Sequence, residues 1–585
     1  MNWDCEFDVV VIGSGAAGMA AALTASLEGL SVLLVEKTSR IGGTTAVSGG
    51  AMWIPLNALA EQAGHPDTPE NILAYLRNTA GPAASQALIG QFLRSGPRAL
   101  DDLTQRTRLK VNARTYSPDY YPDLDGAALG GRSVDPLEFD GRLLGARFAL
   151  LRDPIPDFMV LGGMMVNLVD VRHLLAVARS FASWKHGMRL VLRYWADRLR
   201  GYHRGTRLLL GNSLAAQLFI SLLDRNIEFW LEAPATELIR TTDNSDRAII
   251  GVRVERAGRV LRVRAHRGVV IATGGFAQDA TMREQHFPKP TGPYSMMAEG
   301  SQGEGINLAR NAGARMATAP SSIAYWTPVS VLKREDGSLH RYPHLIWDRA
   351  KPGLLAVNSA GKRFVNESSS YHDFVEGMYR SHRSVPTIPA ALICDSAFIR
   401  RWGLGLALPG GRPHEHLVRN GYLIRADSIE ELAARLKVPP TELAATISRF
   451  NNYARTGADP EFNKGGSAYN RFLGDASHAP NPCLGPVAQA PFYAVHVYPG
   501  DVGTAWGIDT DEFARALDED AKPIRGLYVV GADMQSPTGG AYPAAGVSLG
   551  PALTFGWVSA MHLAHGAAGV DEIRNTIPPP ATPAS

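Results

Sequence analysis

The chain has 585 residues, of which 45% are hydrophobic, enough for two or more domains with packed cores. Its 59 basic and 56 acidic residues nearly balance, which argues against a general nucleic-acid-binding protein, because such a protein carries a concentrated basic surface. The three cysteines, Cys5, Cys394 and Cys483, lie far apart, so we expect neither a disulfide framework nor a cysteine-ligated metal or iron–sulfur site.

The first residues and the apolar segments bear on where the protein resides. Residues 1–6 include two acidic side chains and lead directly into an apolar run, without the basic and apolar regions of a secretory signal peptide. The longest apolar segment, residues 159–168, has about half of the roughly 18 residues that a membrane-spanning helix needs. We therefore expect a cytoplasmic protein, for which peripheral contact with a membrane stays open.

The first predicted element is a β-strand at residues 7–12, FDVVVI, an apolar and β-branched run. A turn with Gly13, Gly15 and Gly18 follows, and then a helical pattern that ends near Gly29. Residues 31–36, SVLLVE, form a second predicted strand. A strand, a glycine turn, a helix and a strand in this order predict a βαβ unit that binds a dinucleotide.

The residue types in this unit match the needs of a dinucleotide. The first glycine permits the tight turn, the second lets the backbone approach the pyrophosphate, and the third lets helix and strand pack closely. The pyrophosphate then lies at the helix N-terminus, where free N–H groups and the helix dipole favour an anion. Glu36 lies 18 residues after Gly18, where its carboxylate can accept hydrogen bonds from a ribose diol. The unit by itself leaves both NAD and FAD open.

Farther along the chain the pattern changes and then returns. Residues 145–225 are largely helical in pattern, and residues 280–490 mix short strands with helices, among them a hairpin at 354–366 and a helix that starts at Pro440. From Gly526 a strand, a glycine-rich turn and a long helix follow, and residues 578–585 predict a disordered tail. We therefore expect an α/β nucleotide-binding domain (1–280 and 490–577) that is interrupted by an α+β catalytic domain (281–489).

Three segments carry a family resemblance: RIGGTTAVSGG at residues 40–50, VVIATGGF at 269–276 and GLYVVGAD at 526–533. In them the sequence closely resembles the fumarate reductase/succinate dehydrogenase flavoprotein family, whose glycine-rich loop runs under the flavin. The resemblance covers essentially the whole chain and implies that the cofactor is FAD, held in a Rossmann-like FAD-binding domain. It also implies a noncovalent flavin, because no histidine occurs between Met1 and Asn57, where succinate dehydrogenases tether theirs.

The cofactor contacts that these motifs predict are spread over the chain. They are Gly13, Ser14, Gly15, Ala16, Ala17, Gly18, Glu36, Lys37, Gly42, Gly43, Thr44, Thr45, Ser48, Gly49, Gly50, Ala235, Thr273, Gly274, Gly275, Asp533, Ser548 and Leu549.

Three further elements point to one branch of this family. Where fumarate reductases carry an arginine in the C-terminal glycine turn, this chain has Tyr542-Pro-Ala-Ala-Gly546, similar to the 3-ketosteroid Δ1-dehydrogenases. The Δ4-(5α)-ketosteroid dehydrogenases instead tend to have Tyr-x-Ser-Gly, from which Ala544 departs. PDYYP at residues 118–122 and AYWTP at 324–328 resemble the segments that bring two further tyrosines to the active site of the Δ1 enzymes.

The chemistry of 1,2-dehydrogenation gives these tyrosines roles. The reaction removes a proton from C2 and a hydride from C1, so the 3-keto oxygen needs hydrogen-bond donors, which we assign to the Tyr542 hydroxyl and the Gly546 N–H. A phenolic base needs a partner near neutral pH, since a free phenol titrates near about 10. The resemblance implies Tyr325 as the base, Tyr121 as its partner and flavin N5 as the hydride acceptor. Tyr120 is the natural rival of Tyr121, because adjacent side chains point in different directions.

The sequence also allows activities other than 1,2-dehydrogenation of a 3-ketosteroid. A related flavoenzyme could act on another cyclic ketone or enone, with Δ4-(5α) dehydrogenation or C=C reduction as its reaction, and a non-enzymatic FAD protein is a distant third. For the main prediction, the substrate is a 3-ketosteroid and an external acceptor such as a quinone reoxidises the flavin. Asp533, where the Δ1 enzymes usually have asparagine, leaves the exact substrate open more than the cofactor.

A basic helix is predicted at residues 187–210. Its apolar stripe comprises Met188, Val191, Leu192, Trp195 and Leu199, and six arginines surround the stripe. The helix could pack through this stripe on the FAD domain. Alternatively, it could lie at a membrane surface or a subunit interface through which a lipid-soluble steroid enters.

Overall fold

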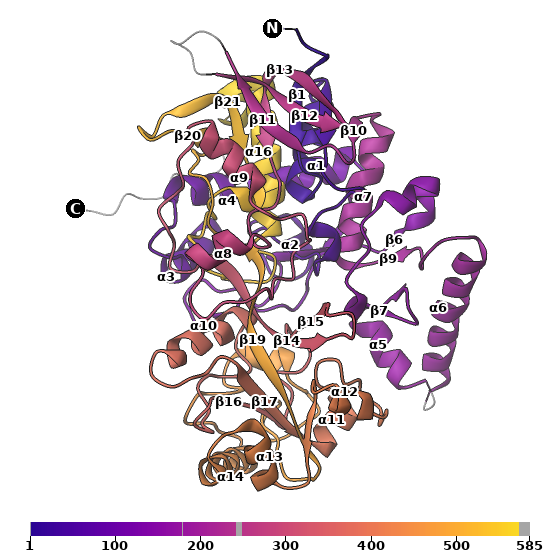
Figure 1. Ribbon diagram of the computed structural model, residues 1–585, viewed down its shortest axis with the longest axis vertical. Coiled ribbons are helices and arrows are strands. Elements are labelled where there is room, and N and C mark those ends of the chain that lie inside the picture. Colours follow the sequence, from indigo (N-terminus) through magenta and orange to yellow (C-terminus); the bar gives the residue numbers. More distant parts are fainter. Residues whose placement is uncertain (1, 178–179, 242–247, 572–585) are drawn as a thin grey trace.

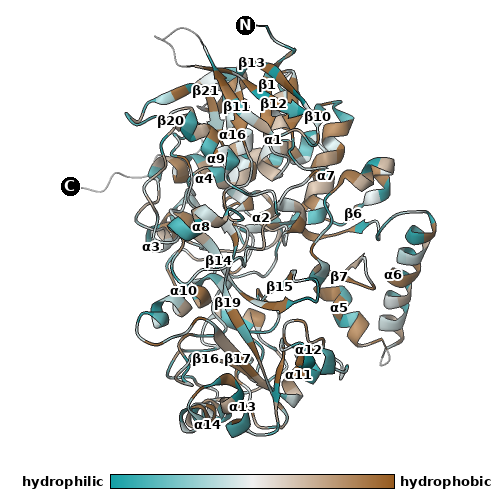
Figure 2. Cartoon of the chain, viewed as in Figure 1, coloured by the Kyte–Doolittle hydropathy of each residue, from teal (hydrophilic) through white to brown (hydrophobic). Residues whose placement is uncertain are grey.

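The computed structural model describes residues 2–177, 180–241 and 248–571. The molecule is elongated, with a sheet near each end of its long axis and a helical arm at one side (Figure 1). Hydrophobic residues follow the strands of both sheets (Figure 2), and many of them are fully buried. The expected class is confirmed: an α/β domain with a mostly parallel central sheet is interrupted by a second, α+β domain.

The first sheet has the strand order β10-β2-β1-β13-β12-β11, with β21 and β20 beside β13. Strands β1 (Cys5–Ile12), β2 (Val32–Val35), β10 (Glu228–Trp230), β13 (Arg259–Ile271) and β21 (Pro523–Val529) run parallel. Strands β11 (Ala235–Arg240), β12 (Ile249–Arg256) and β20 (Arg515–Leu517) pair antiparallel. Every residue of β2 is buried, as expected of a central strand covered on both faces.

Small residues allow the helices of this domain to approach one another closely. Helix α1 (Ala16–Leu27) packs against α16 (Leu549–Asp571) and α7 (Leu210–Asp224), and α4 (Gln86–Arg106) packs on α16. A Cβ at Gly556 of α16 would lie 2.4 Å from the carbonyl oxygen of Ala17, so the two helix backbones are almost in contact there. This packing fixes the start of α1 relative to the start of α16.

The second sheet has the order β15-β14-β19-β17-β16, with β18 beside β19. Its strands are β14 (Ala324–Lys333), β15 (Leu339–Pro343), β16 (Leu354–Val357), β17 (Ala390–Asp395), β18 (Ile424–Ala426) and β19 (Phe492–Thr504). All pairings in it are antiparallel. Helices α10 (Tyr371–His382), α11 (Ser396–Trp402), α13 (Ile429–Leu436) and α14 (Pro440–Thr456) lie around this sheet (Figure 1).

Two expectations for this region differ from the structure. The hairpin predicted at residues 354–366 is wrong: Asn358 and Gly361 form the turn, but β16 pairs with β17 and residues 362–366 form no strand. Strand β19 belongs to the second sheet, although it lies beyond the expected boundary at residue 489. The sequence missed both because strand partners are chosen by long-range packing. The predicted tail at 578–585 lies outside the described residues.

The arm consists of α5 (Leu168–Leu175), α6 (Phe181–Leu199) and the short strand pairs β7–β8 (Met159–Val160, Met164–Met165) and β6–β9 (Phe139–Asp140, Arg207–Leu208). Helix α6 lies at the outer edge of the molecule (Figure 1). The helix expected at 187–210 differs from the structure, in which α6 ends at Leu199 and a short strand, β9, follows. Of the two alternatives for it, packing of the apolar stripe on the FAD domain is wrong: Leu190 and Tyr194 pack within the arm, whereas Leu192, Trp195 and Leu199 are exposed. In the described part of the chain no helix is long and apolar enough to cross a bilayer.

The remaining elements are short connections. They are β3 (Met52–Trp53), α2 (Leu59–Gln62), α3 (Pro69–Thr79), β4 (Val111–Ala113), β5 (Ser133–Pro136), α8 (Ala280–His286), α9 (Glu304–Asn311), α12 (Glu415–Arg419), α15 (Ala468–Leu473) and the 3-10 helices Thr45–Val47, Gly141–Leu150, Pro156–Phe158 and Gly531–Asp533.

Candidate active site

A cavity lies at the carboxyl ends of β1, β2 and β13, at the start of α1. This is where ligands bind in parallel α/β sheets. Sixteen of the predicted cofactor contacts line it: Gly13, Ser14, Gly15, Ala16, Ala17, Glu36, Lys37, Gly43, Thr44, Thr45, Ser48, Ala235, Thr273, Gly274, Ser548 and Leu549. Segments far apart in the sequence therefore meet around one cavity.

The three glycines of the first turn differ in what surrounds them. A Cβ at Gly13 would lie 2.2 Å from the carbonyl oxygen of Ala272, and one at Gly18 would lie 2.0 Å from that of Gly13. Gly15 faces open space, since the nearest atom to its Cβ position is the Thr45 hydroxyl at 3.7 Å. Gly13 and Gly18 thus permit backbone packing, and Gly15 leaves room for a ligand to reach the backbone.

The cavity has the chemistry that the ADP half of FAD needs. Gly15 precedes helix α1 and offers no side-chain cap. The Ala16 N–H donates to the Thr45 hydroxyl at 2.9 Å, and the following N–H groups of the first turn can bind a pyrophosphate. The buried Glu36 carboxylate accepts hydrogen bonds from the Ser14 hydroxyl at 2.6 Å and the Thr38 hydroxyl at 2.9 Å. A ribose diol could replace these hydroxyl donors at the same oxygens. The residues present therefore fit FAD.

Six predicted cofactor contacts do not line this cavity: Gly18, Gly42, Gly49, Gly50, Gly275 and Asp533. Asp533 is buried and accepts hydrogen bonds from the Thr273 hydroxyl at 2.8 Å and from the N–H groups of Gly274 and Gly275 at 3.0 and 3.1 Å. Burial raises the pKa of Asp533, and these hydrogen bonds lower it only in part. In this structure the residue ties the turn after β13 to the turn after β21.

The sequence missed part of the cavity lining, because no motif marks those residues. They include Thr38, Arg152, Met297, Ala298, Ser301, Glu304, Val502, Gly503 and Thr504. The last three form the end of β19, so a strand of the second sheet closes the cofactor cavity.

A group of buried tyrosines lies beside this cavity. The ring of Tyr542 has its centroid 5.0 Å from that of Tyr325, 5.2 Å from Tyr120 and 5.3 Å from Tyr371. The hydroxyls of Tyr542 and Tyr371 are 2.6 Å apart. A Cβ at the cavity-lining Gly503 would lie 3.7 Å from the Tyr325 ring, which places Tyr325 at the cavity edge. Two of the predicted catalytic tyrosines therefore meet, and Tyr371 joins them although no motif marked it.

The two adjacent tyrosines, Tyr120 and Tyr121, point in different directions. The Tyr120 N–H donates to the carbonyl of Pro543 at 2.8 Å, and its ring lies in the buried group beside Tyr542. Tyr121 instead donates its hydroxyl to Asp373 at 2.7 Å. The predicted pairing of Tyr121 with Tyr325 stays a prediction, while the geometry favours Tyr120 as the residue nearer to the site.

Gly546 adopts a backbone conformation that suits its predicted role. Its φ of +100° lies in the left-handed region, and a Cβ would lie 2.5 Å from the backbone nitrogen of Trp53. The carbonyl of Gly546 accepts from the Trp53 N–H at 3.0 Å, which fixes the orientation of the turn. The residue thus lies four positions after Tyr542 and just before α16, whose first turn presents N–H groups.

The arginines and the histidine nearest to the tyrosines form hydrogen bonds with other groups of the chain. Burial raises the pKa of Tyr371, and the charges of Arg114 and Arg349 lower it in part. Arg114 donates to both oxygens of Asp135. Arg349 donates to the carbonyl oxygens of His344, Leu345, Glu367 and Ser369. His372 accepts at Nδ1 from the Trp326 N–H, and burial lowers the pKa of His372 to about 3, so the ring is neutral. Among the described residues, the tyrosines therefore lie between aromatic rings and a neutral His372, with Arg114 paired to a carboxylate and Arg349 held by neutral carbonyl oxygens.

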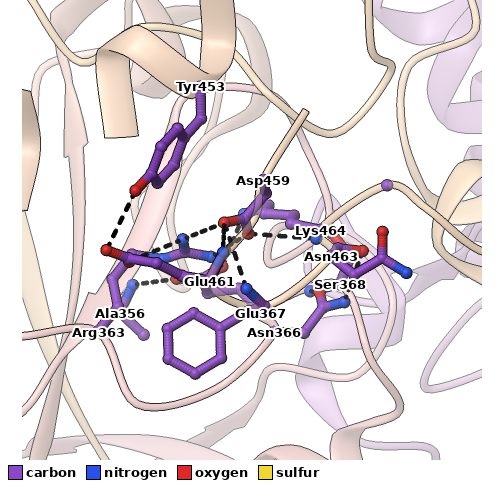
Figure 3. Close-up of polar contacts among 12 residues, drawn as sticks. Ala356, Arg363, Asn366, Glu367, Ser368, Tyr453, Asp459, Glu461, Asn463 and Lys464 are labelled. Atoms are coloured by element: carbon purple, nitrogen blue, oxygen red, sulfur yellow. Dashed lines mark hydrogen bonds and ion pairs between the residues drawn. The ribbon is translucent and has the colours of Figure 1, made fainter. Parts of the chain in front are cut away.

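A buried ion cluster holds the segment that leads into α10 (Figure 3). The Arg363 guanidinium donates to both oxygens of Glu367 at 2.8 Å and to those of Asp459 at 3.0 and 2.9 Å, and Lys464 lies 3.4 Å from Glu367. The cluster ties residues 363–367 to the loop after α14. It thereby fixes the start of α10, which carries Tyr371.

Comparisons with known proteins identify the family of the chain. A family model described as FAD binding domain matches residues 8–549. The 4-oxocyclohex-2-ene-1-carboxylate 5-dehydrogenase of Sinomonas cyclohexanicum is 38% identical over 94% of this chain and 92% of its own, and the 3-oxosteroid 1-dehydrogenase of Mycobacterium tuberculosis is 36% identical over 96% and 98%. The crystal structure of the 3-ketosteroid Δ1-dehydrogenase of Sterolibacterium denitrificans in complex with 1,4-androstadiene-3,17-dione superimposes with a TM-score of 0.88, at 36% identity over 96% of this chain and 99% of that one.

Proposed function

The chain belongs to the FAD binding domain family of flavoprotein oxidoreductases, and on this basis we propose that it dehydrogenates the C1–C2 bond of 3-ketosteroids. The observation that supports the proposal is the contact of the Tyr325 and Tyr542 rings beside the cofactor cavity, which residues 548 and 549 of the segment after Tyr542 line. Bound FAD supplies the two-electron acceptor, N5, for the hydride that leaves C1.

The residues of this chain then have separate tasks. The Tyr542 hydroxyl and the Gly546 N–H donate to the 3-keto oxygen and stabilise the negative charge that develops there. Tyr371, whose hydroxyl lies 2.6 Å from that of Tyr542, can donate to the Tyr542 oxygen and so strengthen its donation to the substrate. Tyr325 takes the proton from C2, and the electron pair of that C–H bond forms the enolate. The apolar surroundings exclude water from the enolate.

A small carboxylated cyclohexanone or cyclohexenone is the second candidate substrate, because two relatives are named for such compounds. A carboxylate in an apolar site needs a cation to pair with. Arg114 is paired with Asp135, and Arg349 directs its N–H groups to carbonyl oxygens of the chain, so neither guanidinium is placed to clamp a substrate carboxylate. This favours a neutral steroid over a carboxylate.

The test is anaerobic reduction of the bound flavin by a panel of ketones. We expect 4-androstene-3,17-dione to bleach the flavin rapidly and to yield the 1,4-diene, while 4-oxocyclohexanecarboxylate reacts at least about tenfold more slowly. A 5α-reduced 3-ketosteroid that gives a 4-ene product would reveal Δ4 regiochemistry, and oxidation of the pre-reduced enzyme by a 1,4-diene would reveal C=C reduction. If only the carboxylated ketone bleaches the flavin, the steroid assignment is wrong.

The reduced flavin needs an external oxidant, for which we propose a quinone. The expected result is steady-state turnover with a soluble naphthoquinone that exceeds turnover with oxygen alone. Equal turnover with oxygen and quinone would contradict this choice of acceptor.

We further propose that the protein contacts an anionic membrane surface through the exposed face of α6. The exposed fractions of Leu192, Trp195 and Leu199 are 61%, 55% and 88%, an unusual exposure for large apolar side chains on one helix. Exposed cations lie on the same helix and at its end: Lys185, Arg189, Arg198 and Arg200. The single acidic residue of α6, Asp197, is buried. Apolar and basic side chains together favour the surface of an anionic bilayer.

Co-sedimentation with vesicles tests this contact. We expect wild-type protein to bind vesicles that contain phosphatidylglycerol at low salt, and Lys185→Glu with Arg189→Glu to release it. The matched control places the same charge changes far from α6, at the exposed Arg259 and Lys437, and should bind as wild type does. Absence of wild-type binding, or formation of a dimer that α6 substitutions dissociate, would overturn the proposal. Arg193 and Arg204 are unsuitable targets, since they pair with Glu138 and Asp153.

A further inference from the structure

A chain of three hydroxyl groups runs from Tyr325 into the turn that carries Tyr542. The Tyr325 and Ser536 hydroxyl oxygens are 2.7 Å apart, those of Ser536 and Thr538 are 3.0 Å apart, and the Thr538 hydroxyl lies 2.8 Å from the carbonyl oxygen of Ala541. All three side chains are buried. Ala541 immediately precedes Tyr542, so the chain links the strand of one tyrosine to the turn of the other.

The carbonyl at the end of the chain determines the direction of its hydrogen bonds. A carbonyl oxygen only accepts, so Thr538 must donate its single hydroxyl proton to Ala541. Thr538 can then only accept from Ser536, and Ser536, whose proton is used, can only accept from Tyr325. The neutral Tyr325 phenol therefore donates to Ser536, and its remaining lone pair is free to face the substrate.

Each hydroxyl can also donate in the opposite direction, because a hydroxyl group is both a donor and an acceptor. When Tyr325 loses its proton to solvent, the Ser536 hydroxyl can turn and donate to the phenolate, and Thr538 can turn and donate to Ser536. Donation to the charged form of an acid favours that form and lowers its pKa.

We infer that Ser536 and Thr538 are positioning residues for Tyr325, which orient its hydroxyl in the neutral state and stabilise its phenolate in the ionised state. The inference deepens the proposed function and rests on it, because it presupposes that Tyr325 takes the C2 proton. Neither residue touches the reacting atoms, and both act through Tyr325.

The charged groups near Tyr325 are paired or neutral, so the Ser536 and Thr538 hydroxyls are the main polar influence on its pKa. Burial raises the pKa of Tyr325 to about 12, and the hydrogen bonds from Ser536 and Thr538 lower it. On the neighbouring strand β19, Asp501 is paired with Arg283. On α10, His372 is neutral, and Glu376 accepts a hydrogen bond from the Trp326 indole. On the turn, burial raises the pKa of Tyr542 well above that of a free phenol, so it stays uncharged.

The test is the pH profile of the rate of anaerobic flavin reduction at saturating steroid. A hydrogen bond to a charged group contributes about 1.5–3 kcal/mol, which corresponds to roughly one to two pKa units. We therefore expect Ser536→Ala to move the rising limb of the profile upward by about one to two pH units, with a rate about 10- to 100-fold lower near neutral pH. Thr538→Val, which keeps the side-chain shape, should move the limb in the same direction by less.

The conservative control is Thr538→Ser, which loses a methyl group but keeps the hydroxyl and should retain the wild-type profile. If Ser536→Ala and Thr538→Val lower the rate by the same factor at every pH, or change nothing, the inference is overturned. If Ser536→Ala fails to retain FAD, the comparison of Thr538→Val with Thr538→Ser decides. Tyr325→Phe separates the two proposals: wild-type rates in that variant would refute the base itself, whereas an inactive variant with unshifted Ser536→Ala profiles would refute only the hydroxyl chain.

Discussion

The Tyr542→Phe substitution removes a single oxygen from the centre of the tyrosine group. That oxygen lies 2.6 Å from the Tyr371 hydroxyl, and the Tyr542 side chain is only 4% exposed. The ring contacts with Tyr120, Tyr325 and Tyr371 persist in phenylalanine, so the packing should remain. The change therefore isolates the hydrogen bond that we assign to the 3-keto oxygen.

The magnitude follows from what remains after the oxygen is lost. Removal of one oxyanion donor usually lowers the rate by about 10²–10³, or about 2.7–4 kcal/mol. The Gly546 N–H still donates in this variant, and the Tyr371 hydroxyl is near enough for partial replacement, so we expect a loss near the lower limit, about 10². Tyr371 also loses its partner in a buried place, which should reduce the free energy of unfolding by about 1–3 kcal/mol.

Stopped-flow flavin reduction under anaerobic conditions measures the loss of rate, and thermal unfolding measures the loss of stability. The FAD content should equal that of wild type, because Tyr542 does not line the cofactor cavity. A variant that is slow only because it lost FAD would be recognised by its absorbance. Reduction by a 3-ketosteroid at the wild-type rate would refute the role of Tyr542, even if the stability falls as expected.

Three other predictions concern the neighbouring tyrosines, the cofactor and the ion cluster. Tyr120→Phe should slow flavin reduction more than Tyr121→Phe, because Tyr120 lies beside Tyr542; the reverse order would restore the prediction based on Tyr121. Glu36→Ala should weaken FAD binding by roughly 1–3 kcal/mol, measured by flavin release on dilution, and full retention would count against the ribose contact. Burial raises the pKa of Glu367, but Arg363, Lys464 and their hydrogen bonds outweigh it and hold that pKa at about 2, below the ordinary 4.5. Its stabilising effect is therefore present above pH 4.5 and is lost as the pH falls from about 4.5 to about 2, so the difference in melting temperature between wild type and Glu367→Gln should narrow over that interval. A constant difference would contradict the role of the charge.

The features that the sequence predicted best are those formed by residues close together along the chain. The turn at Gly13, Gly15 and Gly18 is local, and its flanking strands, its helix and Glu36 all lie within the first 36 residues, so the position of the cofactor cavity could be inferred. Tyr325 and Tyr542 came from short motifs of a known family, and the structure brings the two together.

What depends on long-range packing could not be predicted. Tyr371, Ser536 and Thr538 belong to no motif, and their importance follows only from distances to Tyr542 and Tyr325. The periodicity of α6 predicted a buried stripe, yet a helix whose apolar side has no partner shows the same periodicity as one that packs. A choice between Tyr120 and Tyr121 likewise needs the backbone direction.

The strand order of the first sheet constrains when the protein can acquire its cofactor during synthesis. Strand β1 pairs with β13, where Val9 lies beside Gly268, and β13 pairs with β21, where Val269 lies beside Leu527. The cavity is lined by residues from Ile12 to Ala552. A nascent chain on the ribosome therefore exposes an incomplete sheet until nearly all of it has emerged, and such distant pairings form slowly. The complete cofactor cavity therefore forms only after the start of α16, with Leu549 and Ala552, has been synthesised, and we expect tight FAD binding to follow that step.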